Sequence, residues 1–160
     1  MNEHPSFLFV CLGNICRSPL AEAALRAEAD KHRLDLTIDS AGTGFWHVGN
    51  PPDPRARAEA HRHGIDIADY KARQVCADDF YKFTYILALD AENLAHLASI
   101  APDEGTAQFG LLMETVAPGE ARSVSDPYHG DASDFAQTWR EVSQAAQAIA
   151  ERLVAGAVPV

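Results

Sequence analysis

The chain has 160 residues, 47% of them hydrophobic, and carries a formal net charge of −10. This length and composition favour one globular domain, residues 1–160, over a disordered chain, and no apolar run is long enough to span a membrane. The acidic balance argues against binding to nucleic acid, which requires a basic face on the protein.

The first residues and the cysteines indicate the cellular compartment. The N-terminus has no basic segment ahead of an apolar one, so it does not resemble a secretory signal peptide. The three cysteines, Cys11, Cys16 and Cys76, are too few and odd in number for the disulfide framework of a secreted domain. We therefore expect a cytoplasmic protein, in which a cysteine can stay reduced and reactive.

Short strands alternate with helices along the first half of the chain. Ser18 and Pro19 are typical of a helix start, with Ser18 as the cap, and Gly64 is typical of a helix end. In chain order, we expect a strand at residues 6–10, a loop at 11–17, a helix from 18 to about 31, a strand at 36–39, a loop at 40–53 and a helix at 54–62.

The second half continues the alternation and closes with a long amphipathic helix. Its apolar residues, from Phe135 to Leu153, recur at helical spacing. In chain order, we expect a short helix at residues 77–82, a strand at 84–89, a helix at 91–100, a strand at 109–113, a polar loop at 114–129 and a helix at 134–155.

This alternation predicts an α/β fold, in which a doubly wound parallel sheet is covered by helices on both faces. In such folds, ligands bind beyond the carboxyl ends of the strands. Residues 11–17, here named the Cys11 loop, follow the first strand and so lie at that edge of the sheet.

The Cys11 loop has the residue types of an anion site that also carries a nucleophile. Gly13 and Asn14 tolerate positive φ, so the loop can curl and direct its backbone N–H groups inward, beside a helix N-terminus. The planar guanidinium of Arg17 can bind two phosphate oxygens. The same positive surroundings favour the thiolate of Cys11, so the sequence predicts a phosphate site with a nucleophilic sulfur.

Two further residues of this region allow alternative interpretations. Ser18 can donate a hydrogen bond to the sulfur and ease departure of the thiolate, or it can serve only as the helix cap. Cys16 can form a reversible disulfide with Cys11 that protects it from over-oxidation, or it can be a small buried side chain.

The segment Val10-Cys11-Leu12-Gly13-Asn14-Ile15-Cys16-Arg17-Ser18-Pro19 resembles the signature of the low-molecular-weight protein tyrosine phosphatase family. The likeness extends over nearly the whole chain, in the family's order. Further similar blocks are Asp39-Ser40-Ala41-Gly42-Thr43, Trp46, Gly49-Asn50-Pro51-Pro52-Asp53, His63-Gly64-Ile65, Ala72-Arg73-Gln74, Tyr85-Ile86-Leu87-Ala88-Leu89-Asp90, Asp126-Pro127-Tyr128 and Gly130.

The resemblance implies a four-stranded parallel sheet of the phosphotyrosine phosphatase I type and hydrolysis of phosphotyrosine without a metal or other cofactor. Cys11 would be the nucleophile, Arg17 the phosphate clamp and Asp126 the general acid. The protein would act as a monomer on tyrosine-phosphorylated proteins, a tyrosine kinase among them. The residues that would bind the substrate or shape its site are Leu12, Gly13, Asn14, Ile15, Cys16, Ser18, Trp46 and Tyr128.

Two positions depart from the family pattern. A second tyrosine often follows the Asp-Pro-Tyr sequence, whereas this chain has His129, which makes one pocket wall smaller and titratable. A histidine that supports a serine of the site is often found where this chain has Tyr70, and a tyrosine hydroxyl is a candidate substitute. We also expect Asp90 to bond Tyr128, as the resemblance suggests, or to cap the helix that starts at Ala91.

Two other functions fit parts of the pattern. An arsenate reductase can share the fold and the Cys11 loop, but its relay needs further cysteines, and beyond the loop the chain has only Cys76. A phosphate-binding module without activity would lack the nucleophile or the acid, and this chain has candidates for both.

Overall fold

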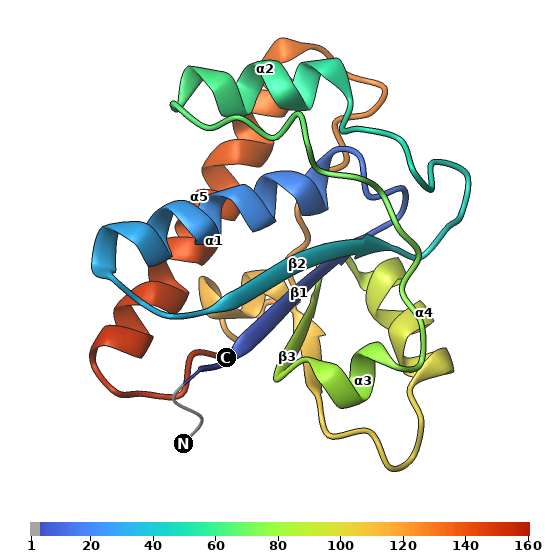
Figure 1. Ribbon diagram of the computed structural model, residues 1–160, viewed down its shortest axis with the longest axis vertical. Helices are drawn as coiled ribbons and strands as arrows, with labels where there is room; N and C mark the ends of the chain where they lie inside the picture. Colours follow the sequence, from blue (N-terminus) through green and yellow to red (C-terminus); the bar gives the residue numbers. More distant parts are fainter. Residues whose placement is uncertain (1–3) are drawn as a thin grey trace.

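The computed structural model describes residues 4–160 (Figure 1). Strands and helices alternate along the chain as the sequence predicts. In chain order, the elements are β1 (Ser6–Cys11), α1 (Arg17–His32), β2 (Thr37–Gly42), α2 (Pro54–Arg62), α3 (Asp79–Lys82), β3 (Tyr85–Ala88), α4 (Ala91–Ile100), β4 (Gln108–Leu111), the 3-10 helix η1 (Leu112–Thr115) and α5 (Ala132–Val154).

The strands form one four-stranded parallel sheet in the order β2-β1-β3-β4, which confirms the predicted fold class. β1 pairs with β2 on one side, with Cys11 opposite Gly42, and with β3 on the other. After β1 the chain continues to β2 on one side of the sheet, and after β3 it continues to β4 on the other side. Such a switch point opens a crevice beyond the carboxyl ends of the strands, where doubly wound sheets bind ligands.

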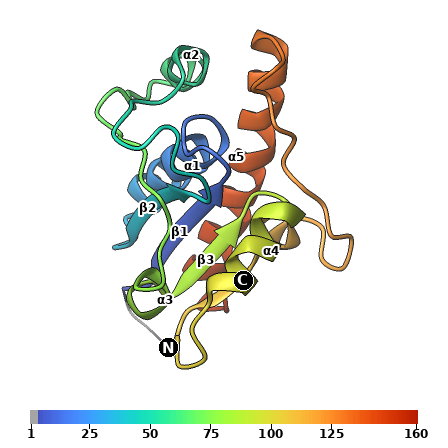
Figure 2. The ribbon, with the colours of Figure 1, turned by 90° about the vertical axis from the view of Figure 1, so that its right-hand side faces the viewer.

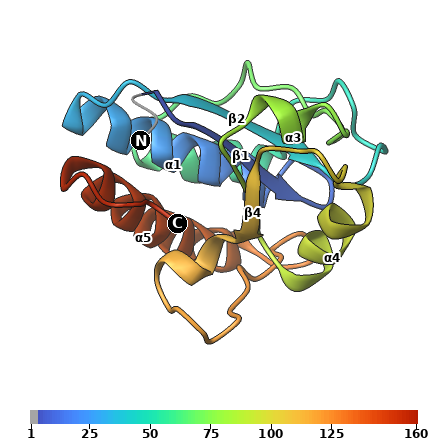
Figure 3. The same cartoon turned by 90° about the horizontal axis from the view of Figure 1, so that it is seen from below.

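Alternate residues of β1 face the two helical layers, since successive side chains of a strand point to opposite sides. Phe7 and Phe9 pack in the cluster formed with α1, α2 and α5. Leu8 and Val10 pack with residues of α3 and α4 on the other face. The two layers can be followed in Figures 2 and 3. Of the helices within residues 4–160, none combines the length and apolar character needed to cross a membrane.

The strand predicted at residues 109–113 is shorter than expected. β4 ends at Leu111, and Leu112 and Met113 begin η1. Both side chains are buried in the same cluster, on the side of α1 and α5. A strand would have pointed them to opposite faces, so the chain leaves the extended conformation to bury both.

The prediction that Ser18 caps α1 is wrong. The helix begins one residue earlier, at Arg17, with Cys16 at the N-cap position, and the Cys16 side chain makes no capping hydrogen bond. Ser18 therefore lies within the first turn, where its hydroxyl points to the Cys11 loop. The first-turn amide groups are left to other partners, and an anion is the partner that a helix N-terminus favours.

Candidate active site

Cys11 is the last residue of β1, and its side chain is only 3% exposed. The sulfur accepts a 3.3 Å hydrogen bond from the backbone N–H of Asn14 and lies 3.0 Å from Oγ of Ser18. Asn14 already donates to Ser18 Oγ from its side-chain amide at 2.8 Å, so the Ser18 proton is free to point elsewhere. Its other acceptor, the Ala41 carbonyl, is more distant at 3.5 Å, and the sulfur is the better partner.

Asn14 fixes the curl of the Cys11 loop. Its φ of 57° lies in the left-handed region, which Asn tolerates better than most residues. The side chain donates to Ser18 and Ser40 through Nδ2 and accepts from the backbone N–H of Arg73 at 3.0 Å. The amide thus ties the loop to α1, β2 and the segment after α2.

Gly13 does not adopt the positive φ that we expected of it. Glycine is favoured here instead by the close approach of the His47 side chain. A Cβ at this position would lie 3.0 Å from Cδ2 of His47, which is tighter than an ordinary carbon–carbon contact.

The buried carboxyl group of Glu22 supports the Cys11 loop through Ser40, which bonds Asn14. Ser40 donates to Oε1 of Glu22 at 2.7 Å. The loop serine, Ser18, has Asn14 and the Cys11 sulfur as partners, so neither serine needs Tyr70, the candidate substitute for the family histidine. Burial raises the pKa of Glu22 above its ordinary value, although Ser40 and Arg26 oppose this. Burial, with the charge of Glu22, raises the pKa of Tyr70 to about 12. The sequence did contain the signal, since Glu22 lies one helical turn after Ser18.

Arg17 is only 3% exposed, and its guanidinium is held by hydrogen bonds. Its Nη1 donates to Oδ2 of Asp90 at 2.7 Å and to the carbonyl of Val124 at 3.1 Å. Burial by itself lowers the pKa of Arg17, but the Cys11 sulfur and Asp90 outweigh it and leave the pKa above its ordinary value. The guanidinium therefore stays charged beside the sulfur.

Asp126 reaches the same place from the loop before α5. Its Oδ2 lies 3.8 Å from Nη2 of Arg17, and its Oδ1 accepts a 3.1 Å hydrogen bond from the backbone N–H of Tyr128. The carboxyl group is 47% exposed, so it is open to water and to a bound molecule. Asp126, which is distant in the sequence, is thus brought beside Cys11 and Arg17 of the Cys11 loop.

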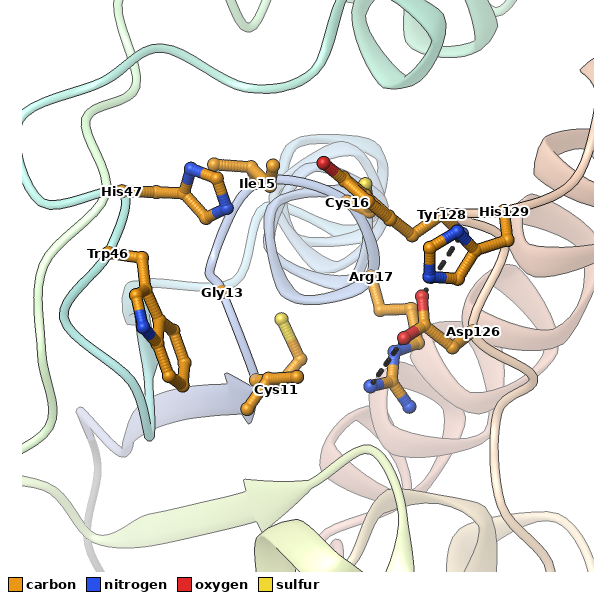
Figure 4. A pocket seen from close by; sticks show the side chains of 11 residues that line it. Cys11, Gly13, Ile15, Cys16, Arg17, Trp46, His47, Asp126, Tyr128 and His129 are labelled. Carbon is orange, nitrogen blue, oxygen red and sulfur yellow. Dashed lines mark hydrogen bonds and ion pairs between the residues drawn. The ribbon is translucent and has the colours of Figure 1, made fainter.

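These residues surround a cavity of about 240 Å³ (Figure 4). Trp46 and His47 stand on one side of it and Tyr128 and His129 on the other, with Cys11 between them. Asn14 and Ser18, predicted among the residues that bind the substrate or shape its site, are buried and do not line the cavity. The lining residues are Cys11, Leu12, Gly13, Ile15, Cys16, Arg17, Trp46, His47, Asp126, Tyr128 and His129.

The two cysteines of the loop differ in their surroundings. Burial raises the pKa of the Cys16 thiol far above its ordinary value, and the negative charges of Asp53 and Cys11 add to this. Cys11 instead has two hydrogen-bond partners and the Arg17 charge beside it. Cys16 therefore stays a thiol, and Cys11 is the sulfur suited to attack.

Comparison with known proteins decides the family. The family model described as "Low molecular weight phosphotyrosine protein phosphatase" matches residues 6–157. The chain belongs to this family. The Schizosaccharomyces pombe low molecular weight phosphotyrosine protein phosphatase is 44% identical over 138 residues, which are 84% of this chain and 88% of that protein.

A bacterial member of the family is similarly close. The Bacillus subtilis low molecular weight protein-tyrosine-phosphatase YfkJ is 41% identical over 152 residues, 94% of each chain. Its crystal structure matches with a TM-score of 0.87 at 37% identity, covering 97% of this chain and 98% of that one. These relatives of the low molecular weight phosphatase family confirm the predicted resemblance and do not favour the arsenate reductase alternative.

Asp90 is a charged partner of this phosphatase site that the sequence did not predict. We expected Asp90 to bond Tyr128 or to cap a helix, and it does cap α4 by accepting from the backbone N–H of Asn93. Its second role, as the acceptor for Arg17, was not foreseen. The position of Asp90 at the end of β3, next to β1, was the available signal.

Proposed function

We propose that this phosphatase hydrolyses phosphotyrosine in proteins through a phosphocysteine intermediate. Cys11 is the nucleophile, Arg17 holds the phosphoryl group, and Asp126 is the general acid and then the base. The observation that carries the proposal is the meeting of a buried sulfur, a charged guanidinium and an accessible carboxyl group at one cavity.

In the first step, the Cys11 thiolate attacks phosphorus and the bond from phosphorus to the tyrosine oxygen breaks. The leaving oxygen takes a proton from the Asp126 carboxyl group and departs as neutral tyrosine. The Arg17 guanidinium and the backbone N–H groups of the Cys11 loop bind the equatorial oxygens, where negative charge is spread in the transition state.

In the second step, a water molecule attacks the phosphocysteine and gives a proton to Asp126. The sulfur–phosphorus bond breaks, inorganic phosphate is released, and Cys11 returns as a thiolate. The hydroxyl of Ser18, 3.0 Å from the sulfur, is suited to stabilise this thiolate as it leaves.

The walls of the cavity support an aryl phosphate as the substrate. Trp46 and Tyr128 stand on opposite sides of it, and an aromatic ring between them would contact both. Because Cys11, at the bottom of the cavity, is only 3% exposed, the phosphate must stand on a side chain long enough to reach its sulfur. Phosphotyrosine has that length, whereas phosphoserine and phosphothreonine carry the phosphate close to the backbone.

A phosphopeptide panel with phosphotyrosine, phosphoserine and phosphothreonine tests this function. The wild type should release phosphate from the phosphotyrosine peptides alone. Cys11→Ser should abolish turnover while inorganic phosphate still binds, and Asp126→Ala should lower turnover of phosphotyrosine by about 100-fold or more. Near-normal activity of Cys11→Ser, or equal release from all three peptides, would overturn the proposal.

We also propose an oligomeric state, a class of substrate protein and a cellular location. The site is complete within one chain, so we expect a monomer, which sedimentation of the purified protein would check. Tyrosine-phosphorylated proteins, a tyrosine kinase among them, are the substrates that we expect. The need to keep Cys11 reduced supports a cytoplasmic location, which cell fractionation would test.

A further inference from the structure

Asp126 lies in the segment at residues 124–131, named here the acid loop. Upstream of Asp126, the loop is fixed at Val124, whose N–H donates to the carbonyl of Leu89 at 2.8 Å and whose carbonyl accepts from Arg17. Downstream of Asp126, the carbonyl of Tyr128 is held by a residue of α2, Arg55. Asp126 therefore sits two residues from each of two anchors.

Arg55 uses its guanidinium as a bridge. Nη2 and Nη1 donate to the carbonyls of Tyr128 and Gly130, at 2.9 Å and 3.0 Å. Nε and Nη2 also bind the two carboxylate oxygens of Asp53, at 3.0 Å and 2.9 Å. These hydrogen bonds hold the pKa of the Asp53 carboxyl group below its usual range, so the pair stays ionised.

The guanidinium also lies over an aromatic side chain. Its central carbon lies 4.7 Å from the ring centre of Phe135, which is 1% exposed at the start of α5, and 5.8 Å from that of Tyr128. A cation over an aromatic face is attracted to it, so Phe135 helps to hold Arg55 in this position.

Asp53 connects this bridge to the Cys11 loop. Its backbone N–H donates to the carbonyl of Ile15 at 2.8 Å. We propose that Arg55 is a positioning residue that, through Asp53, sets the distance from the Cys11 loop to Asp126 for proton transfer. This inference rests on the role of Asp126 proposed above.

Proton transfer is sensitive to such a distance. A general acid must approach the leaving oxygen to about 2.6–3.2 Å, and a displacement of about 1 Å can cost about 100-fold in rate. The requirement applies only when the leaving group needs a proton. Phenol needs one, whereas 2,4-dinitrophenolate is stable enough to leave without it.

The test compares kcat/KM on phenyl phosphate and on 2,4-dinitrophenyl phosphate, since this parameter reports the step in which the leaving group departs. Arg55→Met keeps the length of the side chain and removes its donors. It should lower kcat/KM on phenyl phosphate by about 10- to 100-fold and on 2,4-dinitrophenyl phosphate by less than about twofold. The ratio of the two values does not depend on how much of the variant is folded.

Two controls isolate the mechanism. Arg57→Met removes an exposed arginine from the same helix and should leave the ratio unchanged. In an Asp126→Asn background, Arg55→Met should cause no further loss on phenyl phosphate, because the group that it positions is already inactive.

The outcomes separate this inference from the proposed function. An equal loss on both substrates in Arg55→Met, or a further loss in the Asp126→Asn background, would overturn the positioning role. If Asp126→Asn itself affects both substrates equally, Asp126 is not the acid and the proposed mechanism fails.

Discussion

Asp90 accepts a 2.7 Å hydrogen bond from Arg17, and this pair joins the end of β3 to the start of α1. Arg17 is 3% exposed and the Asp90 side chain 22%, so the pair lies largely out of water. The other oxygen of Asp90 accepts from the N–H of Asn93 and caps α4. One carboxylate therefore orients the phosphate clamp and begins a helix.

Asp90→Asn should separate these two roles, because asparagine is a good cap but carries no charge. We expect the free energy of unfolding to fall by about 2 kcal/mol, the range of a hydrogen bond to a charged group. Asp90→Ala should cost about 1 kcal/mol more, because the cap is also lost. Urea denaturation measures both values, and two variants as stable as the wild type would contradict the pairing.

Ser18→Ala should slow the second chemical step more than the first. The Ser18 hydroxyl lies 3.0 Å from the sulfur, and its removal takes a donor from the departing thiolate. We expect kcat on p-nitrophenyl phosphate to fall by about 10-fold, with a burst of p-nitrophenol before the steady state. A stopped-flow trace without a burst, or an unchanged kcat, would assign Ser18 to structure alone.

Cys16 should protect Cys11 from peroxide. Peroxide converts the Cys11 thiolate to a sulfenic acid, and the Cys16 thiol, buried in the same loop, can displace water from it to form a disulfide. Mass spectrometry after mild peroxide should detect the Cys11–Cys16 linkage in the wild type and sulfinic acid at Cys11 in Cys16→Ser. Sulfinic acid in the wild type without any linkage would contradict the protective role.

Glu22→Gln should change the pH dependence of stability. Because burial raises the pKa of folded Glu22, its contribution is fully present below the unfolded pKa of about 4.3 and is lost as the pH rises through the folded value. Glutamine does not titrate, so the stability of the wild type relative to the variant should fall as the pH rises above about 4.3. Thermal melting at several pH values checks this, and a difference that grows with pH would contradict it.

The local part of the site could be predicted from the sequence. Cys11 and Arg17 are six positions apart in one loop between a strand and a helix. So short a loop is enough to place both residues at one site. The alternation of elements gave the sheet and its ligand-binding edge. Asp126 came from the family resemblance, because nothing local connects it to residue 11.

The partners of these residues could not be predicted, because each depends on how distant elements meet. Asp90 reads locally as a helix cap, and only the pairing of β1 with β3 brings it to Arg17. In the sequence, Arg55 is an ordinary residue of the first turn of a helix, and only the folded structure shows that it bonds the acid loop. Leu112 and Met113, which begin the 3-10 helix η1, are predicted as strand because apolar residues fit either conformation.

The central claim is that phosphate passes through a covalent bond to Cys11. Rapid acid quenching during turnover of a phosphotyrosine peptide, followed by mass spectrometry of the fragment that contains Cys11, tests it directly. We expect the phosphoryl group on Cys11 in the wild type and no phosphorylated fragment from Cys11→Ser. A phosphoryl group on another residue, or full turnover by Cys11→Ser, would contradict the mechanism.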